Sequence, residues 1–406
     1  MRVTMRVTTR APRPPNRWGP GEWAGAFGDL GTLLPFVLAY LAVVRMDPAG
    51  VLCGFGLALV GSGLYYRTPM PVQPMKAIGA VAAAQAQAAQ GVALSAGMVH
   101  GAGLVTGLLW LLLGATGAAQ RIARWVGAAV VRGLVLGLAL ALLLQAGRLM
   151  RDEPALALAA LAVLAPAVWP AVWPARPLRG LGALGLLAAL LLGLGWTALH
   201  DPAAYAALAG VRPALRLPSF AWPALSAQDL LSATLLLALP QLPLTLGNAL
   251  VAVHAETRRL FPRHEVGERE IALSTGAMNV VGSAIGGVPM CHGAGGLAAH
   301  VAFGARTGGS VVILGLLLLA LGLCFAQAVT TLFGLLPPQV LGAVLAATAL
   351  QLGAAQLRGG AQPLTQAERA LLAATAALSV WHVGAGLAVG IVLQQALRAR
   401  SRRVTR

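Results

Sequence analysis

The sequence predicts an all-α polytopic membrane protein whose fourteen transmembrane segments form two inverted halves of seven. Three observations lead to this fold class: an apolar composition, several long apolar runs and a motif that occurs twice. Hydrophobic residues make up 58% of the 406 positions and charged residues only 10%, with a mean hydropathy of +0.77. A chain this apolar cannot keep most of its residues in water, which excludes a soluble globular protein.

Long apolar runs indicate helices that cross a bilayer, because about 20 apolar residues span the hydrocarbon core as a helix. The runs of this length with few or no charges are 101-119, 126-147, 181-199, 229-253, 311-335 and 371-397. The 50 glycines and 25 prolines are tolerated where membrane helices pack closely or are broken. We therefore expect a helical bundle in the lipid bilayer that contains broken helices.

The net charge of +17 would suggest a nucleic-acid partner in a soluble protein, but here the arginines gather in tails and short loops. No nucleic-acid partner is therefore expected. The basic tails 1-23 and 398-406 are both cytoplasmic by the positive-inside rule, in a multi-pass protein of the inner (plasma) membrane. The same rule assigns three loops to the cytoplasm: the one with Arg121 and Arg124, the one with Arg176 and Arg179, and His254 to Glu270.

Two segments about 220 residues apart resemble each other, which indicates an internal repeat. Val60-Gly61-Ser62-Gly63 leads to a Pro-Met motif that begins at Pro69, and Val281-Gly282-Ser283-Ala284 leads to one that begins at Pro289. The Pro-rich region 200-228 lies between them and is predicted to be an extracytoplasmic loop. It separates a first membrane repeat, 24-199, from a second, 229-397.

Seven predicted segments lie in each half. They are 24-44, 48-66, 74-88, 93-117, 126-147, 155-173 and 181-199, then 229-252, 271-287, 292-304, 311-335, 339-357, 367-379 and 380-397. Because seven is odd, the second half enters the membrane from the opposite side, which makes the repeats inverted. The segments 74-88 and 292-304 are too short to span alone and follow the Pro-Met motifs, so they are the predicted broken half-helices.

A helix that begins at mid-depth leaves its first backbone amides without intrahelical partners and carries about half a positive charge there. Inverted repeats aim two such ends at one point near the bilayer midplane, where an anion is the natural occupant. The predicted substrate-binding residues lie on or beside the two half-helix starts: Gln73, Lys76, His292, Gly293, Ala294, Gly295 and Gly296. The glycines would let an anion approach the backbone closely.

Each polar side chain of this set also has a simpler interpretation. Lys76 is the only lysine in the chain and costs several kcal/mol within an apolar segment unless it is paired or hydrated, but it could instead extend to the interface. His292 could be a packing histidine with satisfied hydrogen bonds. Gln73 could cap its own half-helix.

Two further polar groups are candidates. Asp29 in the first segment is a candidate for proton or cation coupling, with hydrogen bonding between helices as the alternative. Gln241, Thr245 and Asn248 share one helix face, so Gln241 and Asn248 are predicted to face the substrate. Contacts between helices would explain this polar stripe equally well.

Five local motifs resemble the molybdate transporter family, which is related to the sulfate permeases and shares a seven-plus-seven inverted repeat with uracil permeases. They are 25-32 (GAFGDLGT), 69-76 (PMPVQPMK), 130-133 (VVRG), 240-244 (PQLPL) and 289-297 (PMCHGAGGL). The resemblance implies secondary active uptake of molybdate by alternating access between a core bundle and a scaffold bundle. Few residues follow the last segment, so we expect no cytoplasmic STAS domain, which favours the molybdate branch. The apolar Leu136 departs from the family pattern.

Other functions stay open from the sequence. The same carrier could take sulfate, tungstate or another oxyanion, and crossed half-helices also build anion channels. A membrane-embedded enzyme would use His292 with Cys291, or His254 with Glu256, but no third partner occurs at a consistent spacing. We therefore expect no catalytic residues and no cofactor. The three cysteines lack CxxC spacing, so no zinc site or disulfide framework is expected either. The oligomeric state is open, a homodimer included.

Overall fold

The computed structural model describes residues 14–85, 94–123, 125–172, 181–357, 364–381 and 383–404. In this part the first repeat folds into α1 (Pro20–Phe27), α2 (Leu30–Ala42), α3 (Pro48–Tyr66), α4 (Lys76–Gln85), α5 (Ala96–Ala115), α6 (Ala118–Ala123), α7 (Ala128–Leu149), α8 (Pro154–Val172) and α9 (Leu181–His200). The connection to the second repeat contains α10 (Pro202–Ala206) and two single helical turns, Ala207–Gly210 and Trp222–Ala224.

The second repeat begins with one helix, Ala227–Leu260, which contains α11 (Ala227–Ser232), α12 (Leu239–Leu244) and α13 (Val253–Leu260) joined by the π-helical stretches Ala233–Ala238 and Thr245–Ala252. The elements that follow are α14 (Glu268–Ala284), α15 (Ala294–Ala302), α16 (Gly309–Cys324), a turn at Ala326–Ala328, α17 (Val329–Gly334), α18 (Pro338–Leu357), α19 (Gln366–Trp381) and α20 (Val383–Val404). Strands β1 (Gln73–Pro74) and β2 (Met290–Cys291) precede α4 and α15.

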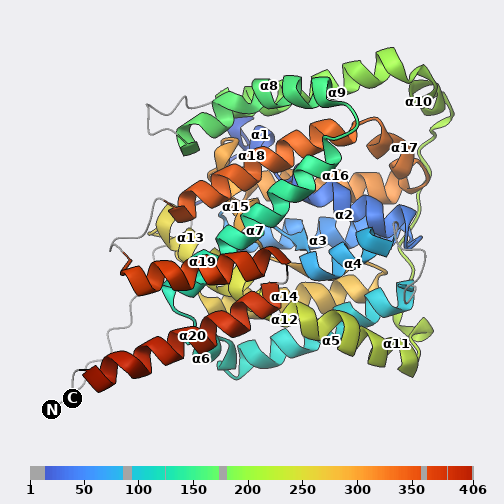
Figure 1. The fold of residues 1–406 in the computed structure, drawn as a ribbon. Helices are drawn as coiled ribbons and strands as arrows, with labels where there is room; N and C mark the ends of the chain where they lie inside the picture. Colours follow the sequence, from blue (N-terminus) through green and yellow to red (C-terminus); the bar gives the residue numbers. More distant parts are fainter. Residues whose placement is uncertain are drawn as a thin grey trace.

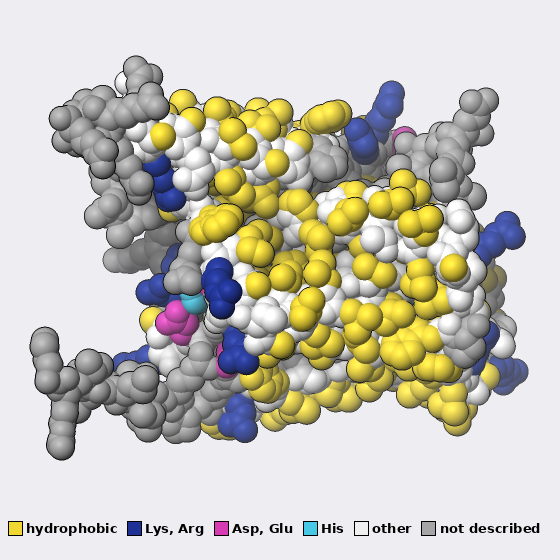
Figure 2. Space-filling view, turned by 90° about the horizontal axis from the view of Figure 1, so that it is seen from below, with side chains coloured by type: hydrophobic (Ala, Val, Ile, Leu, Met, Phe, Trp, Pro, Cys, Tyr) yellow, Lys and Arg dark blue, Asp and Glu magenta, His cyan; other side chains and the backbone are white. Residues whose placement is uncertain are grey.

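Four helices of the described part are long and apolar enough to cross a membrane: Pro48–Tyr66, Ala96–Ala115, Ala128–Leu149 and Ala227–Leu260. Two bent pairs raise this number to six if each pair is one span. Figure 2 shows a face on which hydrophobic side chains cover the middle, whereas Lys and Arg side chains lie mainly towards the edges. The fold is that of a multi-pass membrane protein, while the count of fourteen segments stays a prediction.

Contacts between the two repeats are reciprocal (Figure 1). The second predicted segment of each half packs against the fourth of the other, as α3 on α16 and α14 on α5. In the same way the fifth segment packs against the sixth, as α7 on α19 and α18 on α8. Two halves related by a twofold axis in the membrane plane would make this exchange. The packing therefore supports the predicted inverted repeat.

Several predicted boundaries were wrong, each for a local reason. The segment 24-44 is interrupted by a turn at Gly28–Asp29, where a side chain at residue 28 would collide with Phe303 and the Ala299 carbonyl. The helix predicted to end at 252 continues to Leu260, stabilised in its last turns by an Arg259–Glu256 ion pair. Part of the predicted loop His254–Glu270 is therefore helical.

Two boundaries near the C-terminus also differ. The predicted segment 311-335 bends by 97° after Cys324. There the amides of Ala214 and Arg216 donate hydrogen bonds of 2.8 Å to the carbonyls of Cys324 and Leu323, so the connecting region terminates α16. The predicted tail 398-406 is helical as far as Val404. Residues 1-13, Arg124, the loop with Arg176 and Arg179, and residues 405-406 lie outside the described residues.

Candidate functional site: two half-helices joined by a short ladder

The two Pro-Met motifs pair with each other as antiparallel strands. Gln73 lies opposite Cys291 and Pro74 opposite Met290, and the Met75 amide donates a 2.9 Å hydrogen bond to the Pro289 carbonyl. Asn279 of α14 holds Met290 through both its backbone groups, accepting from the amide at 2.8 Å. The ladder therefore brings the first residues of α4 and α15 together, as the repeat predicted.

The Gln73 side chain connects the ladder to α2 and α15. Its amide donates a short hydrogen bond to Oδ1 of Asp29, which lies at the start of α2 and is almost completely buried. A Cβ atom at Gly296 would lie 2.6 Å from Nε2 of Gln73 and 2.7 Å from Oδ2 of Asp29. A Cβ atom at Gly293 would collide with Oε1 of Gln73. The space beside these two glycines is therefore filled by the side chains of Gln73 and Asp29. The sequence had predicted that an anion would approach the backbone there.

The polar stripe of the helix Ala227–Leu260 contacts both half-helices. Oε1 of Gln241 accepts a 2.9 Å hydrogen bond from the Ala77 amide, in the first turn of α4, and its Nε2 donates to Thr245 at 3.0 Å. Asn248 lies next to Gly293 and is buried, and its Oδ1 has no hydrogen-bond partner among the described residues. The π-helical stretches surround Pro240 and Pro243, which lack the amide that a regular helix needs.

Lys76 begins α4 and is only 6% exposed. Its Nζ atom has no hydrogen-bond partner among the described residues, although Asp29 and Cys291 lie within electrostatic reach. The side chain therefore does not extend to an interface, which was the simpler interpretation. A buried ammonium group without a hydrogen bond is costly, so it indicates a site that receives an acceptor.

His292 lies between the ladder and α14, with both ring nitrogens in use. Nδ1 bonds the Pro71 carbonyl at 2.8 Å and Nε2 bonds Oγ of Ser274 at 2.7 Å. Ser274 in turn lies 2.6 Å from the hydroxyl of Tyr66, whose ring packs edge-on against the imidazole. To donate to an anion, His292 would have to give up one of these bonds.

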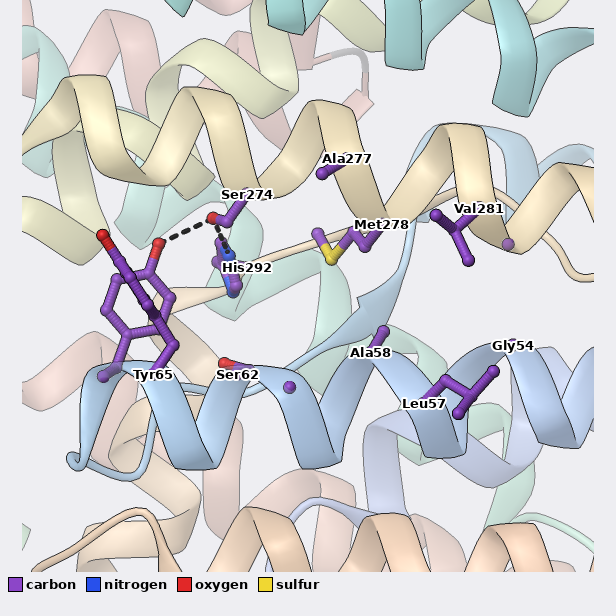
Figure 3. A pocket seen from close by; sticks show the side chains of 13 residues that line it. Gly54, Leu57, Ala58, Ser62, Tyr65, Ser274, Ala277, Met278, Val281 and His292 are labelled. Carbon is purple, nitrogen blue, oxygen red and sulfur yellow. Dashed lines mark hydrogen bonds between the residues drawn. The ribbon is translucent and has the colours of Figure 1, made fainter.

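A pocket of about 240 Å³ opens between α3 and α14, and the polar side chains of Tyr66, Ser274 and His292 line one end of it. Figure 3 shows Ser274 of α14 directed at His292, with Met278 and Val281 along the same helix and Leu57 and Ala58 opposite on α3. Ser62 and Tyr65 also line it, and the rest of the lining is apolar or glycine. The pocket thus reaches the hydrogen-bonded chain from outside the bundle.

Glu22 of α1 is a buried carboxylate that sequence reasoning missed. It accepts hydrogen bonds from the amides of Arg306 (3.0 Å), Thr307 (2.9 Å) and Ser310 (3.0 Å), at the start of α16. It therefore fixes the connection that follows α15. The search for charges in apolar surroundings that selected Asp29 could have found Glu22, which stands among Trp18, Trp23 and glycines.

The residues of the alternative enzyme sites have other partners. His254 bonds the Val266 carbonyl at 2.7 Å and Glu256 pairs with Arg259. Of the predicted substrate residues, Ala294, Gly295 and Gly296 form the buried first turn of α15, beside Gln73. Gln73, Asp29, Lys76, Gln241 and Asn248 converge on the two half-helix starts.

Comparisons with known proteins place the chain in a family. A family model described as "Molybdate transporter of MFS superfamily" matches residues 21–142 and 233–352, one stretch in each half. Molybdate transporter 2 of Arabidopsis thaliana is 30% identical over 94% of this chain and 88% of its own length. Molybdate transporter 1 of Chlamydomonas reinhardtii is 30% identical over 92% of this chain and 91% of its own.

Solved structures share the fold. The murine anion transporter Slc26a9 in its inward-facing state matches 96% of this chain and 69% of its own with a TM-score of 0.63 at 12% identity. The transmembrane domain of the cyanobacterial bicarbonate transporter BicA matches 92% of this chain and 97% of its own, with a TM-score of 0.56 at 17% identity. The family model matches both halves, and the relatives align over nearly the whole chain. The chain therefore belongs to the molybdate transporter family.

Proposed function

We propose that the protein is a secondary active transporter of a tetrahedral oxyanion, molybdate, which it holds between the first turns of α4 and α15. The observation that carries the proposal is the buried ammonium group of Lys76, which has no hydrogen-bond partner among the described residues at a point where two helix N-termini meet. The related molybdate transporters of Arabidopsis thaliana and Chlamydomonas reinhardtii support molybdate as the cargo.

The charges of the site suit a dianion together with one further positive charge. Lys76 contributes one positive charge and the two helix N-termini about half a charge each. Asp29 contributes one negative charge, so a bound dianion leaves the site about one positive charge short. A coupling ion would supply that charge, and Asp29, close to Lys76 and bonded to Gln73, is a candidate to bind it.

Transport then proceeds by alternating access, with the ladder and half-helices moving relative to the bundle of α7, α8, α18 and α19. Both termini lie in the cytoplasm of the proposed inner membrane, as the arginine distribution predicts. Because oxyanions of equal charge and shape differ mainly in size, sulfate is the main alternative cargo.

Calorimetry on the purified protein in detergent tests the cargo. We expect molybdate to bind and tungstate to displace it, while an excess of sulfate does not. Equal competition by sulfate would instead make the protein a general sulfate carrier, and absence of binding by all three anions would contradict the proposal.

Counterflow distinguishes a carrier from a channel. Proteoliposomes loaded with unlabelled molybdate should accumulate labelled molybdate transiently, because a carrier exchanges its substrate across the membrane. A channel would dissipate the gradient without this overshoot and would show single-channel currents.

A further inference from the structure

We propose that His292 is the binding site for a proton that is transported with the anion, and that Ser274 and Tyr66 deliver this proton. This inference rests on the proposed transport function and names a second substrate for it: the proton is the coupling ion, and His292 binds it in place of Asp29. It is carried by the hydrogen-bond geometry around His292, where the hydroxyls of Ser274 and Tyr66 each have a second acceptor available.

With a neutral ring, every hydrogen bond of the chain has one consistent direction. Nδ1–H donates to the Pro71 carbonyl, so Nε2 must accept from the Ser274 hydroxyl. Ser274 then accepts from the Tyr66 hydroxyl at 2.6 Å. The neutral state leaves no ring nitrogen without a partner.

With a protonated ring, the same atoms bond in the reverse direction. Nε2–H donates to Ser274, whose hydroxyl can turn to the Ile271 carbonyl at 3.1 Å. The Tyr66 hydroxyl can turn to the Glu270 carbonyl, also at 3.1 Å. These two carbonyls in the first turn of α14 let the chain accept one proton without breaking a bond to the ring. A histidine that merely packs would need only one of these arrangements.

The proton moves by successive transfers along the chain. A hydronium ion in the pocket donates a proton to the Tyr66 oxygen and is left as water, while the Tyr66 proton passes to the Ser274 oxygen and the Ser274 proton passes to Nε2 of His292. Three O–H or N–H bonds form as three O–H bonds break, so one proton is gained and no electron is transferred. In this proposal the proton enters through the pocket between α3 and α14, because Tyr66, Ser274 and His292 all line it.

Several titratable and charged groups surround His292 on the packed elements. Tyr66 and Tyr65 lie on α3, Glu270 lies on α14 with its carboxylate accepting from the Gly267 amide, and Cys291 precedes the ring. Lys76 on α4 and Asp29 on α2 lie around the adjoining half-helix starts. A charged imidazole in these apolar surroundings costs several kcal/mol unless an anion is close. Because Gly293 follows the ring directly and leads into α15, anion binding there would favour the proton, and the linkage is reciprocal.

Calorimetry with molybdate in buffers of different ionisation enthalpy measures the protons taken up on binding. We expect the wild-type protein to take up about one proton per anion near neutral pH. The variant His292→Gln keeps a donor for Pro71 but cannot be protonated, so its proton uptake should fall to near zero while molybdate still binds. Unchanged proton uptake in this variant would overturn the inference.

A second pair of variants tests the route. In proteoliposomes that enclose a pH-sensitive dye, Tyr66→Phe should slow molybdate-driven acidification at least about tenfold, because the first oxygen of the chain is lost. Tyr65→Phe is the matched control, since Tyr65 is exposed at the pocket and lies next to Tyr66. Equal rates in the two variants would contradict the route.

If His292→Gln does not fold, the variant Ser274→Ala tests the proton site instead. It leaves the ring in place but removes the acceptor of the second ring proton, so proton uptake on binding should drop, and an unchanged value would overturn the inference. Molybdate binding by the wild type without proton uptake would refute only the proton site. No molybdate binding at all would instead refute the proposed function.

Discussion

The amide of Ala77 donates a 2.9 Å hydrogen bond to Oε1 of Gln241, which joins the first turn of α4 to the first long helix of the other repeat. One of the amides that an anion could use in that turn thus already has a side-chain acceptor. Gln241 therefore orients the end of α4 as well as lining the proposed site. Its neutral amide fulfils this role without adding charge.

Replacing Gln241 by Glu should weaken anion binding. The carboxylate still accepts the Ala77 bond, but it places a negative charge where the anion binds, so we expect molybdate affinity to fall at least about tenfold. Titration calorimetry measures this change. Gln228→Glu, on the exposed surface of α11, is the control with the same charge change. Equal affinities of the two variants would place the anion elsewhere.

The residues of the site could be predicted from sequence where they belong to one short motif. Lys76, Gln73 and the glycines follow from a Pro-Met motif before a short apolar segment, and their meeting follows from the repeat. The role of the glycines could not be foreseen, because the side chains that fill the space beside Gly293 and Gly296 come from distant segments, through Gln73 and Asp29. Tertiary contacts between the repeats decide this packing.

The fold could likewise be predicted where a local pattern specifies it, but not where tertiary contacts decide. Helices α3, α5 and α7 lie close to their predicted ranges because long apolar runs specify them. The turn at Gly28–Asp29 and the bend after Cys324 were missed, since each depends on what packs there: Phe303 in one case and the Ala214–Arg216 connection in the other. Apolar composition continues through both breaks and carries no signal of them.

Replacing Lys76 by Met should separate stability from binding. A charge-assisted hydrogen bond contributes about 2 kcal/mol, so we expect roughly a thirtyfold loss of molybdate affinity. The unliganded variant should unfold at the same or a higher temperature in detergent, because a buried ammonium group is removed. Arg258→Met, at an exposed position, controls for the loss of one positive charge. Wild-type affinity in Lys76→Met would remove Lys76 from the site.

Replacing Gly296 by Ala should disturb the site without unfolding the bundle. The added methyl group would displace Gln73 from Asp29, at a cost of about 1–3 kcal/mol. Lower thermal stability and weaker molybdate binding are therefore expected together. Gly195→Ala is the control, because a Cβ atom there meets no other atom within 4 Å. A Gly296→Ala variant that behaves like this control would show that the space is not needed.

Replacing Glu22 by Gln should destabilise the protein, since one amide oxygen replaces a carboxylate that accepts three backbone amides. Hydrogen bonds to a charged group contribute about 1.5–3 kcal/mol each, so the unfolding temperature in detergent should fall by several degrees. Glu153→Gln, at an exposed position before α8, serves for comparison. Identical melting curves for the two variants would mean that the Glu22 contacts contribute nothing to stability.

The register of the β1–β2 ladder makes the two repeats chemically unequal at their shared centre. When the two motifs are aligned at their Pro-Met pairs, Val72 corresponds to His292. In the strand register the same two residues lie opposite each other, one position beyond the Gln73–Cys291 pair. Counted from the Val-Gly-Ser stretch of α3 and α14, the counterparts of Tyr66 and Ser274 are Gly287 and Cys53. The ring of His292 and the hydroxyl of Ser274 therefore come from the second repeat and the hydroxyl of Tyr66 from the first, and none of the three has a residue of the same type at its counterpart position. The two repeats share an arrangement of helices but differ in the side chains at their shared centre. A chain with the two repeats in exchanged order would therefore not have an equivalent site.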